Sequence, residues 1–358
     1  MNFKKILIFT LGFLISFSGF SQEAKDRNQE NINVNKFRQL YQEFSTPNMY
    51  RTASGAPGPA YYQQQADYKM DIELDDENKK IYGSETITYT NNSPDNLEYL
   101  WVQLDQNVRK KDSPSLLIDG SGVRPAYAPS GFTKEFLTDP FDGGFNIEYV
   151  VDENNKPLKY IVNQTMMRVD LPSVLKSGEK FSFSIKWWYN IQDHVNQDGR
   201  SGYETFDKDG NRVYIIAQFF PRMAVYNEVE GWQNYQFWGD GEFALPFGNY
   251  DVKITVPSDH ILDATGELQN RKNVFSKEML KRFNKAKKTY DKPVMIVTQA
   301  EAEEAEKGFS KKKKTWHFQA ENVRDFAFAT SRKFIWDMMA VKIGDKDVMA
   351  VSMYPKEG

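Results

Sequence analysis

The sequence predicts a mainly β fold, a saddle-like antiparallel β-domain or sandwich, with a few short helices near the C-terminus. Two observations predict it. From residue 68 onward, segments with alternating apolar and polar residues follow one another, separated by turn-forming residues. Aromatic residues make up 15% of the 358 residues, and aromatic side chains favour half-buried, pleated surfaces. The chain has no cysteine, so its core must be stabilised by apolar burial without disulfides.

Residues 1–21 have the pattern of a secretory signal peptide. Lys4 and Lys5 supply the positive start, an apolar run covers residues 6–20, and small residues precede Gln22. We therefore expect cleavage near Ser21 and a secreted or periplasmic protein. A membrane anchor is the alternative. The run is short for a spanning helix and a polar stretch follows it, so we expect no stable membrane anchor.

Residues 22–59 predict a polar N-terminal extension that leads into the folded domain. The stretch is rich in Asn and Gln and ends in a Gly- and Pro-containing turn cluster at 53–59. Apolar residues at helical spacing predict one or two helical turns within residues 37–44.

The strands are predicted in order from their alternation and from the turns between them. Residues 109–144 carry Pro and Gly without a clean period and predict a loop. Asp207 and Asp209 resemble the start of a calcium loop, but position twelve is Gln218 rather than Glu, so residues 206–211 predict a hairpin turn. The predicted strands are residues 68–74, 81–90, 97–104, 145–151, 166–171, 181–189, 213–220, 251–256 and 316–320.

The segment 271–314 predicts a charged surface insertion with two helices. Residues 275–288 have an amphipathic helical pattern, and Thr298 with Glu301 forms a capping-box pattern before a short acidic helix that ends at Gly308. Basic runs at 271–288 and 311–314 flank the acidic stretch 301–306, so the charges compensate one another. With a net charge of −3, we expect no nucleic-acid partner.

Several phrases follow one another in an order that resembles the N-terminal domain of the aminopeptidase N family of zinc metallopeptidases, the gluzincin aminopeptidases. The resemblance covers about residues 60–358. Its strand phrases are residues 68–74, 81–89 and 97–105. Its other phrases are Phe219-Phe220-Pro221-Arg222, Gly231-Trp232, Glu242-Phe243, residues 250–257, residues 264–268 and residues 323–329.

The resemblance implies that residues 60–340 form a saddle-shaped N-terminal β-domain that closes one side of a peptide cleft. It also implies that residues 341–358 begin a catalytic domain that continues beyond this chain. The family's zinc motif H-E-x-x-H and its G-x-M-E-N strand do not occur in these 358 residues. We therefore expect no catalytic residue, metal ligand or cofactor in this chain. Zinc and peptide substrates are implied for the full-length enzyme through the missing catalytic domain.

The resemblance also implies that this domain contributes one polar or acidic residue to the site for the substrate's amine. Gln218 is the best candidate upstream of Pro221, and Glu228 is the next. Other nearby carboxylates are Glu230, Asp240 and Glu242. The alternative is that all of these are solvated loop and strand-edge groups.

Three histidines, His194, His260 and His317, show none of the local spacing typical of a zinc site. We therefore do not expect them to converge.

A second function stays open, that of a free-standing exported β-rich binding module for carbohydrate or a protein partner. An exposed aromatic row on one sheet face would support it. The candidate row is Trp187, Trp188, Tyr189, Phe219 and Phe220, although alternation within strands favours core positions for these side chains.

Overall fold

The computed structural model describes residues 47–115, 126, 128–133, 137, 141–197, 199, 201–239, 241 and 243–358. The predicted signal peptide and the predicted helical turns at 37–44 lie outside these residues. The chain divides into a unit that ends at Ala60 and a compact unit, Tyr61–Gly358. In the described part of the first unit, an isolated bridge joins Arg51 to Pro57 around a turn.

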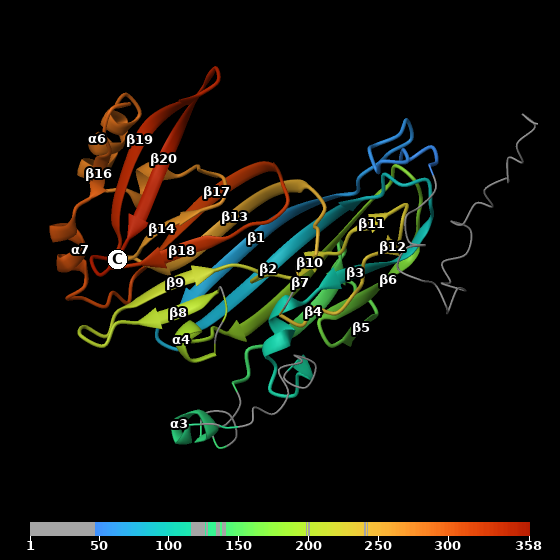
Figure 1. The fold of residues 1–358 in the computed structure, drawn as a ribbon, viewed down its shortest axis with the longest axis horizontal. Helices are drawn as coiled ribbons and strands as arrows, with labels where there is room; N and C mark the ends of the chain where they lie inside the picture. Colours follow the sequence, from blue (N-terminus) through green and yellow to red (C-terminus); the bar gives the residue numbers. More distant parts are fainter. Residues whose placement is uncertain are drawn as a thin grey trace, which may run out of the picture. The chain divides into compact units, whose positions relative to one another are not determined.

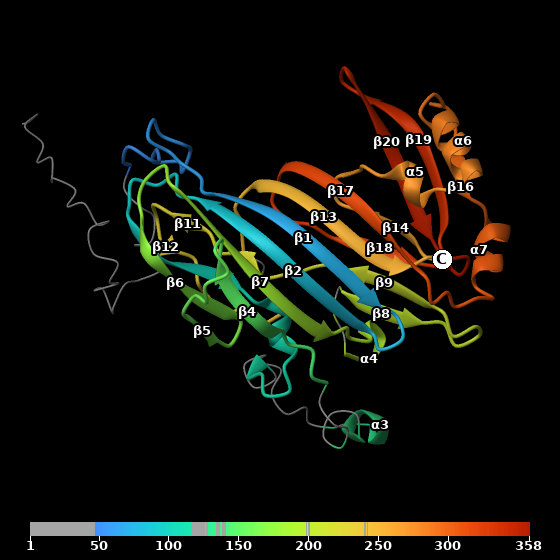
Figure 2. The same cartoon turned by 180° about the vertical axis from the view of Figure 1, so that it is seen from behind.

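A seven-stranded sheet dominates the second unit, with the order β15-β17-β13-β1-β2-β7-β4 (Figures 1 and 2). Its strands are β15 (Glu267–Leu268), β17 (Lys313–Val323), β13 (Gly248–Pro257), β1 (Gln65–Asp75), β2 (Lys80–Thr90), β7 (Lys180–Asn190) and β4 (Asn146–Asp152). The predicted mainly β fold is thus confirmed.

One pairing in this sheet departs from the expected antiparallel meander, because β1 pairs with β13 in parallel, with Tyr68 opposite Tyr250. Parallel neighbours need a long crossover connection. Here the chain between β2 and β13 builds several other strands before it returns. Local alternation carries no information about such a return, which explains why the sequence pattern does not predict it.

The remaining strands form four smaller sheets. One has the order β10-β3-β6-β5, a second β14-β18-β9-β8, a third β16-β19-β20, and β11 pairs with β12. Their bounds are β10 (Arg222–Met223), β3 (Leu97–Gln103), β6 (Met166–Leu175), β5 (Tyr160–Asn163), β14 (Ile261–Ala264), β18 (Phe328–Ser331), β9 (Arg212–Ile216), β8 (Gly202–Thr205), β16 (Val294–Val297), β19 (Ile335–Ile343), β20 (Lys346–Tyr354), β11 (Tyr226–Asn227) and β12 (Gly231–Trp232).

The helices are short. They are the 3-10 helix η3 (Asp105–Arg109), α3 (Pro129–Phe132), α4 (His194–Gln197), α5 (Arg271–Val274), α6 (Lys277–Ala286) and α7 (Gln299–Ala305). The predicted capping box is confirmed: Thr298 accepts from the Glu301 backbone, and Glu301 accepts from the Thr298 backbone. Among the described residues, no helix is long and apolar enough to cross a membrane.

The core lies on the inner face of the large sheet, where alternate residues of β1, β2, β7 and β13 are buried. Trp187 packs directly over Gly83 on the neighbouring strand. A Cβ added at Gly83 would lie 2.3 Å from the Trp187 ring, so only glycine fits there.

The predicted strand at 213–220 is too long. The observed strand β9 ends at Ile216, because Gln218 adopts a left-handed backbone conformation that breaks the pleat. This break defines the candidate site.

Candidate functional site

The site is built around the turn at Gln218, between β9 and β10. Gln218 has φ of 52°, a conformation that is strained by roughly 1–3 kcal/mol for a residue with a side chain. The other described non-glycine residues with positive φ lie in turns next to strands or, for Asn322, at the irregular end of β17. The Gln106 side-chain amide donates to the Gln218 carbonyl oxygen at 2.9 Å and holds this backbone in place.

Arg222 follows the turn and joins three distant parts of the chain. Its guanidinium lies 2.9 Å from Asp105 Oδ2 through Nη2 and 2.7 Å from Asp325 Oδ2 through Nη1. Asp105 begins η3 and Asp325 precedes β18. The Arg222 and Asp105 side chains are almost fully buried, whereas the Asp325 side chain is 42% exposed. Burial alone would lower the pKa of Arg222, but the two carboxylates raise it, so Arg222 stays charged.

Two stacked tyrosines pack behind this ion triad. The rings of Tyr68 and Tyr250 lie 4.7 Å apart, the Met223 amide donates to the Tyr68 hydroxyl, and the Tyr250 hydroxyl donates to the Arg324 carbonyl oxygen. Burial raises the pKa of both phenols above their usual value, so both stay neutral. These two hydrogen bonds hold the backbone at Met223 and at Arg324, next to Arg222 and Asp325.

An open cavity of about 400 Å³ lies in front of Gln218 and the ion triad. This volume falls in the range of small-ligand sites. Its lining combines apolar side chains with an amide, two guanidinium groups and a carboxylate. The lining residues are Ser201, Ala217, Gln218, Arg222, Phe243, Ala244, Leu245, Arg324 and Asp325.

The charges at the cavity have different environments. Asp325 Oδ1 accepts from the Phe326 amide at 2.8 Å, and burial raises the pKa of the Asp325 carboxyl, although Arg222 partly offsets this. The Arg324 guanidinium lies 4.4 Å from the Phe247 ring and has no carboxylate within ion-pair distance among the described residues. The Gln218 side-chain amide has no hydrogen-bond partner in the described part of the chain.

Glu228, the second predicted site residue, is buried, but it does not line this cavity. Glu230 accepts a hydrogen bond from the Tyr235 hydroxyl on the surface. Asp240 and Glu242 lie outside the described residues. The structure therefore brings only Gln218, of the predicted site residues, to the cavity, and the role of Gln218 and Glu228 in substrate binding stays a prediction.

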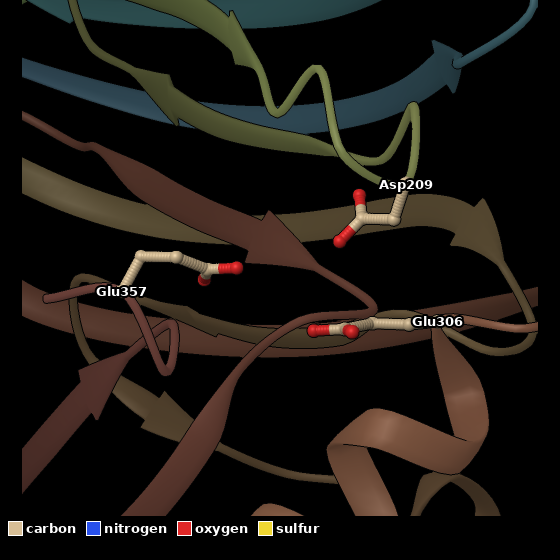
Figure 3. A group of neighbouring side chains, drawn as sticks. All are labelled: Asp209, Glu306 and Glu357. Atoms are coloured by element: carbon tan, nitrogen blue, oxygen red, sulfur yellow. The ribbon is translucent and has the colours of Figure 1, made fainter.

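A group of three carboxylates lies elsewhere, and Figure 3 shows that Asp209, Glu306 and Glu357 point toward a common centre. The ammonium of Lys333 occupies this centre. It donates to Asp209 and Glu306 and lies 3.1 Å from Glu357. Burial would lower the pKa of Lys333, but these carboxylates raise it. A buried cation supplied by the chain thus explains why the three acids are close together.

The three histidines lie on separate elements, and each has a local contact. His194 lies 3.6 Å from Glu204, His317 Nε2 lies 2.9 Å from Asp251, and His260 Nδ1 lies 3.2 Å from the Thr330 hydroxyl. Burial and the nearby Arg332 lower the pKa of His260 to about 3, so this ring is neutral. These residues do not fit a common zinc site.

Two further expectations are confirmed. Residues 206–211 form the turn of the β8–β9 hairpin. Trp187, Tyr189, Phe219 and Phe220 are core side chains, as the alternation favours. Trp188 differs, because it lies on the outer face of the large sheet beside Tyr82, with ring centroids 6.5 Å apart.

The sequence reasoning did not assign Asp105, Arg222 and Asp325 to a site. Each stands in a phrase that carries the family resemblance, and each is a charged residue within or next to a largely apolar strand. That placement could have marked them as interacting residues, because a charged side chain in an apolar strand needs a partner.

No family model matches the sequence, and no curated protein matches it. Among solved structures, the chain is similar to an M1 zinc metallopeptidase mutant from Deinococcus radiodurans bound to Tyr-Ser-Ala, at 11% identity and a TM-score of 0.43. That match covers 82% of this chain and 48% of the solved chain. A two-domain M1 zinc metallopeptidase mutant bound to L-tryptophan matches at 10% identity and a TM-score of 0.43, over 84% and 50%. The chain spans about half the length of these proteins.

Proposed function

We propose that this chain is the N-terminal, cleft-shaping part of a secreted zinc-dependent aminopeptidase, which removes residues from the N-terminus of peptides. In this proposal Gln218 contributes to the site for the substrate's amine, with Glu228 as the second candidate. The zinc ion and the chemistry belong to a catalytic domain outside these residues. The described residues do not fit a zinc ion, so no catalytic step is assigned to them.

One observation carries the proposal. Three phrases of the family resemblance, far apart in sequence, line one cavity through Arg222, Phe243 and Asp325. Arg222 also bonds Asp105 across 117 positions and Asp325 across 103. The same turn holds Gln218 in a strained conformation at the cavity wall. Strain of this kind is typical of functional sites, where the surrounding structure enforces it.

The first experiment is to sequence the coding DNA beyond codon 358. An in-frame continuation with G-x-M-E-N and H-E-x-x-H supports the proposal, and a stop codon at that position contradicts it. The complete protein is then assayed for release of N-terminal residues from aminoacyl anilides, before and after treatment with a zinc chelator. We expect the chelator to abolish the activity and added zinc to restore it.

The role of Gln218 is tested in that complete enzyme. Gln218→Ala should raise KM about ten- to a hundredfold, because a hydrogen bond to a charged amine is lost. Gln299→Ala, an exposed position on α7, is the matched control and should leave KM unchanged. If Glu228→Gln raises KM instead and Gln218→Ala does not, Glu228 is the amine-site residue.

The binding-module alternative has one specific observation in its favour. Tyr82 and Trp188 form a partly exposed aromatic pair on the outer face of the large sheet, and Tyr149 lies two strands from Tyr82. The Lys80 ammonium already lies 4.4 Å from the Trp188 ring, which reduces the free stacking surface. Titration with oligosaccharides, compared with Trp188→Ala, tests this alternative, since binding that the substitution removes would support it.

A further inference from the structure

A stripe of lysines lies on the solvent-facing side of α6. Lys277, Lys281 and Lys285 follow one another at intervals of four residues, and all three are exposed. Residues four apart on a helix are neighbours on one face, so this lysine stripe extends along about 12 Å of helix. The other face of α6 is buried in the protein through Met279 and Ala286.

The lysine stripe has few acidic neighbours. Among the described residues, Lys277 and Lys285 have no carboxylate within ion-pair distance, and Lys281 lies 4.0 Å from Glu278. Glu278 is the only acid on α6, and it also lies 3.5 Å from the Arg282 guanidinium. One carboxylate therefore faces several cations along this helix.

The acidic stretch 301–306 does not neutralise the stripe. The charge compensation expected from the sequence reaches Arg282, on the flank of α6, but not the three stripe lysines. The acids of this stretch have other partners, and the ion pairs are Glu301 with Arg282, Glu304 with Lys307 and Glu306 with Lys333. The stripe therefore keeps its positive charge toward the solvent.

Further cations extend this positive surface at both ends of the helix. Lys272 on α5 precedes the stripe, and Lys288 and Lys292 follow it. All three are exposed, and none has an ion-pair partner in the described part of the chain. Figures 1 and 2 show α6 at one end of the second unit, beside β16 and β19.

The shape and chemistry of this surface favour an anionic membrane over a nucleic acid. The outer side of a helix is convex, so it forms no groove that would follow a polymer backbone, and bases need aromatic side chains on which to stack. The one aromatic residue of α6, Phe283, packs against the Phe275 ring. Lysine ammonium groups are point charges without a fixed binding geometry, and a cluster of them attracts anionic lipid headgroups through charge.

We propose that the lysine stripe of α6 binds the headgroups of anionic lipids, so that the protein adsorbs reversibly to a negatively charged membrane surface. The apolar face of α6 stays in the protein core, so adsorption depends on charge and needs no insertion of the helix into the bilayer. This inference does not rest on the proposed peptidase function.

The test measures sedimentation of the purified full chain with lipid vesicles. Vesicles of phosphatidylglycerol mixed with phosphatidylcholine are negatively charged, and vesicles of phosphatidylcholine alone are neutral. We expect much tighter binding to the charged vesicles at low salt. Raising the ionic strength from about 0.1 M to about 1 M should release the chain, because the Debye length falls from about 10 Å to about 3 Å.

A triple variant with Lys277→Gln, Lys281→Gln and Lys285→Gln removes the stripe and changes no buried side chain. It should bind the charged vesicles about a hundredfold more weakly, because each lysine near a charged membrane contributes roughly a fivefold factor. Residues 1–21 are common to the native chain and all variants, so a difference between them reports on the substituted positions. Urea unfolding curves check that each variant folds.

A second triple variant is the matched control, because it makes the same change in net charge on the outer face of the large sheet. Its substitutions, all at exposed positions, are Lys69→Gln, Lys180→Gln and Lys253→Gln. It should leave the affinity nearly unchanged, because charges more than about 10 Å from the bilayer are screened at 0.1 M salt.

Equal affinity for charged and neutral vesicles, or equal losses in the two triple variants, would overturn the inference. Stripe-dependent binding to soluble heparin without binding to charged vesicles would also overturn it, and would identify an acidic polysaccharide as the partner. The peptidase assay uses soluble anilides and no vesicles, so the two proposals can fail separately.

Discussion

Two arginines, Arg222 and Arg332, are buried among carboxylates, and the charged groups around them differ in number. Arg332 is 1% exposed, lies 2.8 Å from Asp76 Oδ2 and 3.2 Å from Asp259 Oδ2, and shares Asp76 with Arg212. Two guanidinium groups therefore face two carboxylates, and the Lys314 ammonium lies nearby. Arg222 alone faces two carboxylates, one of which is partly exposed.

The two networks also differ in how far they are exposed to solvent. In the Arg332 network the side chains of Asp76 and Asp259 are only 11% and 16% exposed, and the Tyr214 hydroxyl donates to Asp76 at 2.7 Å. The network is closed, and it joins the β1–β2 turn to the chain that follows β18. The Arg222 triad is open on one side, where Asp325 is 42% exposed and lines the cavity.

The largest expected effect comes from removing one acid of each network. Asp76→Asn should lower the free energy of unfolding by about 3–5 kcal/mol, because it leaves Arg212 without a carboxylate partner and Arg332 with Asp259 alone. Asp325→Asn should change it by less than about 1 kcal/mol, because Arg222 keeps Asp105 and the charges become balanced. Urea unfolding of both variants measures this. Equal losses would show that the two networks have the same role.

A buried carboxyl group without any counter-charge extends the comparison. Glu85 is 2% exposed, and its two carboxylate oxygens have no hydrogen-bond partner among the described residues. Burial raises its pKa well above the ordinary value of 4.5. The folded state therefore keeps a proton that the unfolded chain releases, and stability should fall as pH rises above 4.5 until the folded-state pKa is reached.

Glu85→Gln should remove this dependence, so the variant gains stability relative to the native protein by about 1.4 kcal/mol per pH unit in that window. Urea unfolding at several pH values measures it. Glu98→Gln, an exposed acid on β3, is the control and should keep the native slope. Parallel pH profiles for the native protein and Glu85→Gln would contradict the argument.

A smaller effect concerns the backbone at the open site. Gln218→Gly should raise the free energy of unfolding by about 1 kcal/mol, because glycine adopts positive φ without strain. Thermal unfolding measures it. A stability loss on substitution would show that the Gln218 side chain stabilises the fold.

The smallest effect belongs to an exposed ion pair. Lys313 and Glu73 pair across the outer face of the large sheet, and both side chains are nearly half exposed. Lys313→Ala should change the free energy of unfolding by less than about 0.5 kcal/mol, because water screens such pairs. In the same urea experiment, the effect of this variant on the free energy of unfolding is compared with the effects of the substitutions in the buried networks.

The long strands of the large sheet were predictable because their signal is local, whereas β19, β20 and the shortest strands were not predicted. In β1 and β2, the residues that alternate in hydrophobicity are those that alternate in burial, and Thr298 and Glu301 form the predicted capping box. The strand predicted at 213–220 was too long, because its alternation continues into residues 219 and 220, which are buried for a different reason. They pack in the core after the turn at Gln218.

The candidate site was predictable only in part. Gln218 could be singled out as a polar residue in an apolar phrase. Its place at the cavity depends on a left-handed turn, and the sequence there has no glycine or asparagine that would predict such a turn. The partners of Arg222 could not be read from spacing, because they lie more than a hundred positions away.

The mainly β class, the long strands of the large sheet, the helix cap at Thr298 and the family phrases could be read from the sequence, because periodicity and capping act over a few neighbouring residues. The parallel pairing of β1 with β13, the position of Lys333 among Asp209, Glu306 and Glu357, and the link that Arg222 makes between Asp105 and Asp325 follow from the tertiary structure alone. These contacts depend on how strands from distant parts of the chain pack around one core, and local patterns do not encode that arrangement.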